Sequence, residues 1–170
     1  MKRNTKLETL LIVAIMIALA VVLSKLLSVN LPFLRIGFGF LPIAIVAILY
    51  GPMWAACASA LADVLGAVLF PTGAFFPGFT VSAFITGLIF GLFLYKKEIT
   101  WTRNLLACAL VCLGVNLLLN TYWLTFFISS KYTVLLAGRA VKEIVAIPVM
   151  MIIIKLTNET IIKAYKKISN

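Results

Sequence analysis

The sequence contains no histidine and few charged residues. Only 12% of its 170 residues are Asp, Glu, Lys or Arg, and only five residues are acidic, whereas soluble domains carry about 25% charged residues. Histidine and paired carboxylates supply most metal ligands and acid–base groups of enzyme sites, so their scarcity argues against metal or hydrolytic chemistry. We therefore expect neither an enzyme nor a bound metal ion or cofactor.

A Gly-x-x-x-x-Gly-Lys-Ser/Thr phosphate loop is also absent from the sequence. The chain is therefore not expected to use ATP by itself in the usual way. The three cysteines, Cys57, Cys108 and Cys112, all lie within apolar runs. Without histidine to complete a metal site, they are interpreted as small, inert core residues.

Hydrophobic residues make up 64% of the sequence, which predicts an integral membrane protein with a single domain over residues 1–170. Backbone polar groups in lipid must be hydrogen-bonded internally, and no alternating barrel pattern occurs, so the predicted fold class is all-α. Six transmembrane helices are expected, at about residues 7–29, 36–50, 53–69, 81–95, 102–127 and 134–166.

The basic residues predict the orientation in the membrane. A cytoplasmic N-terminus places ten of the fifteen basic residues on the cytoplasmic side, namely Lys2, Arg3, Lys6, Lys96, Lys97, Arg103, Lys155, Lys163, Lys166 and Lys167. We therefore expect both termini in the cytoplasm of a bacterial cell, with the first apolar run kept as an anchor and not cleaved as a signal. The net charge of +10 then reflects topology and not nucleic-acid binding.

The other five basic residues fall in the outer half of the predicted bundle: Lys25, Arg35, Lys131, Arg139 and Lys142. Anchoring of helix ends accounts well for Lys25 and Lys131 but poorly for Arg139 and Lys142. Glu143 is spaced to pair with Arg139 along its helix, which leaves Lys142 without an evident local partner.

Asp63 lies in the middle of a predicted helix, where a carboxylate costs at least about 2–3 kcal/mol unless it is paired or hydrated. The break that follows, at residues 70–80, contains two prolines, two glycines and four phenylalanines, including Phe75 and Phe76. With the outer basic residues, these features predict a cationic, aromatic-lined cavity that opens outward. Such a cavity suits a flat, anionic, conjugated ligand.

Two further patterns fall at helical spacing. Asn116, Asn120 and Trp123 share one face of a predicted helix, where they either join neighbouring helices or bind the ligand. Ala14 and Ala18 lie one turn apart, and such small residues let another helix approach closely, inside or outside this chain.

Several elements of the sequence form a combination that extends over nearly the whole chain: residues 34–43, Gly51-Pro52, Asp63, Phe-Pro-Gly-Phe-Thr at 76–80, Gly87, Gly91 and Asn-Thr-Tyr-Trp at 120–123. In these elements the chain resembles the substrate-binding S components of energy-coupling factor vitamin transporters, most closely the folate-specific branch. The resemblance implies outward-side folate binding and delivery across the membrane by toppling. It also implies two kinds of partner, a transmembrane coupling protein that Ala14 and Ala18 contact and two cytoplasmic ATPases.

The resemblance gives the predicted site its chemistry. Asp63 is the candidate acceptor for the donor edge of the pterin, with Asn120 as a second polar contact. The remaining candidates are Phe75, Phe76 and Trp123 for ring stacking, and Arg35, Arg139 or Lys142 for the glutamate tail. One alternative is an S component for another vitamin such as riboflavin. The other is a small membrane enzyme acting on an anionic lipid, which should present the paired acids or histidine that this sequence lacks.

Overall fold

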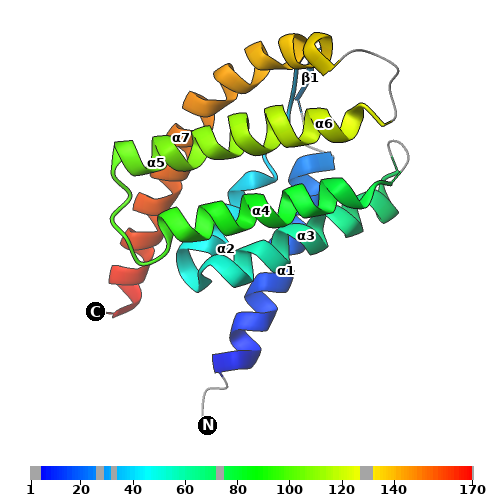
Figure 1. Ribbon diagram of the computed structural model, residues 1–170. Helices are drawn as coiled ribbons and strands as arrows, with labels where there is room; N and C mark the ends of the chain where they lie inside the picture. The colour runs from blue at the N-terminus through cyan, green and yellow to red at the C-terminus, as the bar shows by residue number, and fades with distance from the viewer. Residues whose placement is uncertain (1–4, 26–28, 32–33, 72–74, 127–131, 170) are drawn as a thin grey trace.

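The computed structural model describes residues 5–25, 29–31, 34–71, 75–126 and 132–169 (Figure 1). The helices are α1 (Thr5–Lys25), α2 (Phe40–Tyr50), α3 (Pro52–Leu69), α4 (Pro77–Leu94), α5 (Trp101–Ala109), the π-helix η1 (Leu110–Leu119), α6 (Asn120–Leu124) and α7 (Tyr132–Ser169). Two short strands, β1 (Val29–Leu31) and β2 (Leu34–Ile36), lie between α1 and α2. The fold is the helical bundle that the sequence predicts, with a small hairpin added.

Four helical segments of the described chain are long and apolar enough to cross a membrane: Lys6–Lys25, Pro52–Leu69, Pro77–Leu94 and Trp101–Leu124. The last of these joins α5, η1 and α6 into one continuous span, as Figure 1 shows. The apolar helix α2 has only 11 residues, shorter than the roughly 20 that span a bilayer. In Figure 1 the first turns of α1 and the last turns of α7 lie toward the lower left, away from the end of α3 and the start of α4 at the right.

The hairpin corrects the predicted ends of the first two helices. α1 ends at Lys25, four residues before the predicted end, and α2 begins at Phe40. Between them Asn30 pairs with Arg35 across the antiparallel hairpin. The proline at position 32 disfavours helical backbone at Leu31, which is consistent with the extended conformation there.

The break between α3 and α4 is also shorter than predicted. Pro77 is the first residue of α4, a position at which the missing N–H costs no helical hydrogen bond and the fixed φ suits a helix. The segment from Pro77 to Thr80 therefore forms the first turn of α4 instead of a loop. Pro52 begins α3 in the same way, directly after Gly51, whose φ of +94° favours glycine.

The closest helix pair of the bundle is α3 with α4. A Cβ on Gly87 would collide with the backbone of Ala55, and one on Gly91 would collide with Pro52. Small residues permit this approach, and in lipid such packing stabilises helix pairs where the hydrophobic effect contributes little. The buried core of the bundle includes Val46, Phe90, Cys108, Cys112 and Ile154. Cys57 is exposed on α3, contrary to the predicted core position.

Candidate functional site

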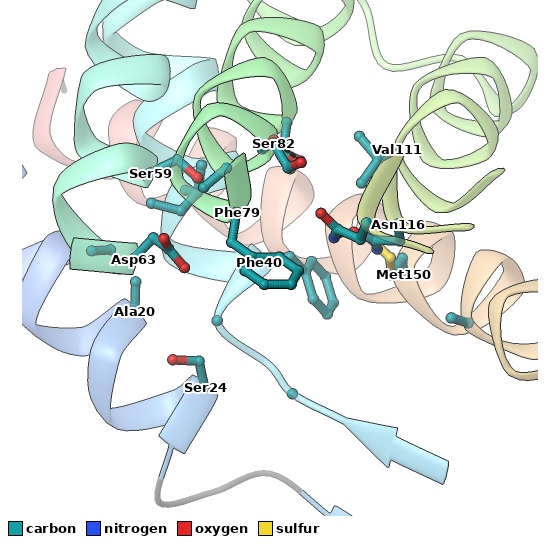
Figure 2. A pocket seen from close by; sticks show the side chains of 18 of the residues that line it. Ala20, Ser24, Phe40, Ser59, Asp63, Phe79, Ser82, Val111, Asn116 and Met150 are labelled. Carbon is teal, nitrogen blue, oxygen red and sulfur yellow. Dashed lines mark hydrogen bonds between the residues drawn. The ribbon is translucent and has the colours of Figure 1, made fainter. Parts of the chain in front are cut away.

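A cavity of about 430 Å³ lies among α1, α2, α3, α4, η1, α6 and α7. Its volume falls in the range of about 300–1,000 Å³ that is typical of small-molecule sites. Figure 2 shows its two walls, with Ser24, Ser59 and Asp63 on one side, Val111, Asn116 and Met150 on the other, and the rings of Phe40 and Phe79 between them.

The first wall is built around Asp63. Its carboxylate points toward the cavity in Figure 2, and its Oδ2 accepts a 2.8 Å hydrogen bond from Thr80 Oγ1. This bond joins the middle of α3 to the first turn of α4. The Asp63 carboxylate therefore has the hydrogen-bond partner that its position in an apolar helix requires. Lys25 also lines the cavity, and its Cε lies 3.2 Å from the position that a Cβ on Gly66 would take. Lys25 is therefore a cavity residue and not only the helix-end anchor that the sequence predicts.

The second wall is a chain of polar groups. Asn120 Nδ2 donates to Asn116 Oδ1 at 3.4 Å, and Asn116 Nδ2 donates to Glu143 Oε2 at 3.4 Å. Lys142 Nζ lies 3.6 Å from Glu143 Oε1. Glu143 therefore pairs with its neighbour Lys142, whereas the helical spacing predicts Arg139. Adjacent residues on a helix do not normally face each other, but both of these side chains line the same cavity.

The π-helix brings Val111 to the same wall as the two asparagines. Val111, Asn116 and Asn120 all line the cavity, although positions five residues apart point to different sides of an α-helix. In η1 the hydrogen bonds run over five residues, as from Asn120 N–H to Val115 O. The wider turns bring Val111 and Asn116 to one side. π-Helical segments are often found at functional sites.

The predicted stacking residues form a cluster beside the cavity. The rings of Phe76 and Trp123 lie 5.5 Å apart, and Phe76 stacks on Phe126 at 5.8 Å. Trp123 Nε1 donates to Ser82 Oγ at 3.1 Å, and Ser82 lines the cavity. Phe75 is exposed. The aromatic side chains that line the cavity are instead Phe40 and Phe79. Phe76 and Trp123 pack against each other and against Phe126.

The structure brings Asp63, Asn120 and Lys142 together at the cavity, but it places Arg139 elsewhere. Arg139 Nη1 donates to Thr121 Oγ1 at 3.4 Å, and Arg139 is not among the cavity residues. Arg35 belongs to β2, but its side chain lies outside the described residues, as does Lys131. Ala14 and Ala18 are exposed on α1, away from the cavity.

The charges at the cavity correct the predicted cationic character. Among the described lining residues two are basic, Lys25 and Lys142, and two are acidic, Asp63 and Glu143. The sequence did not predict Glu143 as a cavity residue, because helical spacing paired the Glu143 carboxylate with Arg139. It also missed Phe40, Thr80 and Ser82, whereas Phe79 is one of the four phenylalanines of the break from which an aromatic lining was predicted. The polar spacing of Asn116 and Asn120 was the signal that pointed to this wall.

Comparisons with known proteins show which family, relatives and solved structure this chain is similar to. Residues 8–157 match the family described as "ECF transporter, substrate-specific component". The "Folate transporter FolT" of Clostridium novyi (strain NT) is 42% identical over 149 residues, which cover 88% of this chain and 87% of the relative. FolT of Leuconostoc mesenteroides subsp. mesenteroides is 34% identical over 173 residues, with 96% and 93% covered. A crystal structure of FolT bound with folic acid is 34% identical, covers 90% of this chain and 93% of that chain, and has a TM-score of 0.83.

Proposed function

The chain belongs to the substrate-specific components of ECF transporters, and we propose that it binds folate in the cavity described above and delivers it across the membrane. It is a multi-pass membrane protein and a transporter subunit. The two relatives named as folate transporters match this chain over 87% and 93% of their own length. A shared fold alone would not assign the substrate, because function depends on the site.

The observation that carries the proposal is the composition of the cavity walls. Carboxylate and amide acceptors of Asp63, Asn120 and Glu143 share the cavity with two ammonium groups, Lys25 and Lys142. Folate has the matching groups, since its pterin carries N–H donors and its glutamate tail carries two carboxylates. Charge-assisted hydrogen bonds of both kinds are stronger and more directional than neutral ones. Phe40 and Phe79 provide apolar surface for the flat rings.

The predicted site residues take the following parts in this proposal. Asp63, Asn120 and Lys142 contact the ligand from the walls they line. Trp123 and Phe76 support the cavity through the aromatic cluster and Ser82. Arg35, Phe75 and Arg139 keep the proposed part of attracting or covering the anionic ligand on its way into the cavity.

The rest of the transporter is supplied by other subunits in this proposal. A transmembrane coupling protein contacts α1 at Ala14 and Ala18, and two cytoplasmic ATPases provide the energy. The exposure of both alanines supports this contact, because small residues at a helix surface allow another helix to come close. Six membrane-crossing segments with both termini in the cytoplasm of a bacterial cell complete the proposed arrangement.

The test is a binding titration of the purified chain in detergent, followed by intrinsic tryptophan fluorescence. Folic acid is expected to bind and riboflavin is not. Asp63→Asn is expected to weaken folic acid binding, whereas the matched control Glu98→Gln is not, because Glu98 is exposed and lies outside the cavity. Binding of riboflavin without folic acid, or no response to either vitamin, would overturn the assignment.

A further inference from the structure

Four basic residues lie at the end of the bundle where α4 ends and α5 begins. Lys96 and Lys97 come shortly after α4, and Arg103 lies in the first turn of α5. Lys155 of α7 reaches the same place, because its Nζ lies 3.8 Å from the centre of the Trp101 ring. Figure 1 shows the start of α5 beside the end of α4, at the left of the bundle. We call these four basic residues the basic patch.

The packing of α5 on α7 fixes the position of the patch. Asn104 is fully buried, and its Nδ2 donates a 2.8 Å hydrogen bond to Met151 O. Trp101 lies about one turn before Asn104, and Lys155 lies about one turn after Met151. The two contacts follow one antiparallel pair of helices, so the indole ring and the ammonium group lie beyond the buried amide at the same end of that pair.

The basic groups of the patch have donors to spare. None of them forms an ion pair with a carboxylate of the described residues. Lys97 Nζ donates to the carbonyl of Leu92 at 2.9 Å, and Arg103 Nη1 donates to the carbonyl of Glu98 at 3.5 Å. An ammonium group has three donors and a guanidinium five, so most of them remain for a ligand. Residues 96–103 and 155–160 contain two acidic residues, Glu98 and Glu159, against the four basic ones.

The patch borders an apolar surface. Trp101 begins the apolar span Trp101–Leu124 and is itself exposed. Leu105 and Leu106, about one turn further along the span, are exposed, and so is Ile152 on α7. Tryptophan is enriched at the level of the lipid headgroups, and lysine and arginine side chains extend toward them. The patch therefore has the arrangement of a membrane interface, with basic groups next to exposed hydrocarbon side chains.

We propose that the basic patch binds the phosphate headgroup of an anionic phospholipid, whose acyl chains lie along the exposed apolar side chains of α5 and α7. Phosphate oxygens accept charge-assisted hydrogen bonds, and a guanidinium can bind two of them at once. A ligand without acyl chains would leave the adjoining leucines unused. None of the four basic residues lines the cavity, so this site is separate from the one proposed for folate. A bound headgroup would hold the start of α5 and the adjoining part of α7 at one membrane surface.

The test uses the full chain in vesicles of phosphatidylcholine and phosphatidylglycerol, with bromine on the acyl chains of one lipid at a time. The changes Trp54→Phe and Trp123→Phe leave Trp101 as the only tryptophan, and bromine close to the ring quenches its fluorescence. Phosphatidylglycerol is expected to be preferred over phosphatidylcholine by about tenfold at this position. Added salt should lower the preference, because exposed charges are screened.

The double variant Arg103→Gln with Lys155→Gln, in the same background, is expected to reduce the preference to within about twofold. The charge-matched control is Lys2→Gln with Lys6→Gln, at the start of the chain, which should keep the full preference. Equal quenching by the two lipids in the unaltered patch would overturn the proposal, and so would a preference that persists in the double variant. If that variant does not fold, the response of the unaltered patch to salt decides, and a preference that salt does not change would overturn the proposal.

A protein partner is the other occupant that the experiment can reveal. Its sign would be equal quenching by the two lipids together with a double variant that no longer assembles with the coupling protein and ATPases. That combination would show the basic patch to be a contact between subunits, and the lipid site would be wrong.

Discussion

Thr80 Oγ1 donates a 2.8 Å hydrogen bond to Asp63 Oδ2 and so fastens the first turn of α4 to the middle of α3 at the cavity wall. The two residues are 17 positions apart, and the Phe-rich break lies between them. Bonds from a neutral donor to a carboxylate are stronger than neutral pairs. The bond orients Asp63 and leaves its second oxygen free for other contacts.

Thr80→Val removes this donor while keeping the side-chain shape. Folic acid affinity is expected to fall about fivefold, or about 1 kcal/mol, because Asp63 loses its fixed orientation. The control is Thr157→Val, since the Thr157 hydroxyl donates to the carbonyl of Ile153 within its own helix. Binding titrations of both variants check the prediction, and equal affinities for the two would contradict it.

A double-mutant cycle on Ser82 and Trp123 measures the link between the aromatic cluster and the cavity. Ser82→Ala and Trp123→Phe each remove one end of the 3.1 Å hydrogen bond. The free energies of unfolding in mixed micelles should be non-additive, with a coupling of about 1 kcal/mol. A coupling near zero would show that the indole is held by ring packing alone.

Gly87→Ala is expected to separate α3 from α4, because the added Cβ would meet the backbone of Ala55. Overpacking of this kind typically costs about 1–3 kcal/mol. Gly138→Ala is the matched control, since its Cβ meets nothing within 4 Å, and helix propensity favours alanine there by up to about 1 kcal/mol. Thermal midpoints from size-exclusion profiles should fall for the first variant and hold or rise for the second. The opposite order would contradict the packing of this pair.

Ala14→Trp addresses the surface of α1. Because Ala14 is exposed, the variant should fold and bind folic acid as the wild type does, within about twofold. Uptake of folate by cells that also express the coupling protein and ATPases should fall by about tenfold or more, since a bulky ring blocks close helix approach. Leu19→Trp, at a position that is 41% exposed on another side of α1, is the control and should transport normally. Equal uptake by both variants would argue against the proposed contact.

The helices could be predicted from the sequence because each apolar run has the length that lipid requires. Pro52 and Pro77 also mark the helix starts that the structure shows. The hairpin could not be predicted in the same way, because Val29 and Ile36 are as apolar as the adjoining helices. Their pairing depends on contacts between two strands, and such contacts leave no periodic signal in segments this short.

The site could be predicted only in part for a similar reason. Asp63, Asn120 and Lys142 are polar residues in apolar surroundings, and this contrast is visible in the sequence. The partner of Glu143 is not visible in the sequence. Helical spacing favours Arg139, but the Arg139 guanidinium donates to Thr121 on α6 instead. A pairing rule within one helix cannot include a competing acceptor on another helix.

The wide turns of η1 change the expected effect of a deletion in this span. Deleting one residue from an α-helix rotates everything beyond the deletion by about 100°. Between Val111 and Asn116 the same deletion would replace a π-helical turn, with hydrogen bonds over five residues, by an α-helical turn with hydrogen bonds over four. The two side chains would then be four residues apart and would still share one face of the helix. Loss of the one extra residue of a π-helical turn is therefore expected to keep the side chains of Asn116 and Asn120 directed at the cavity.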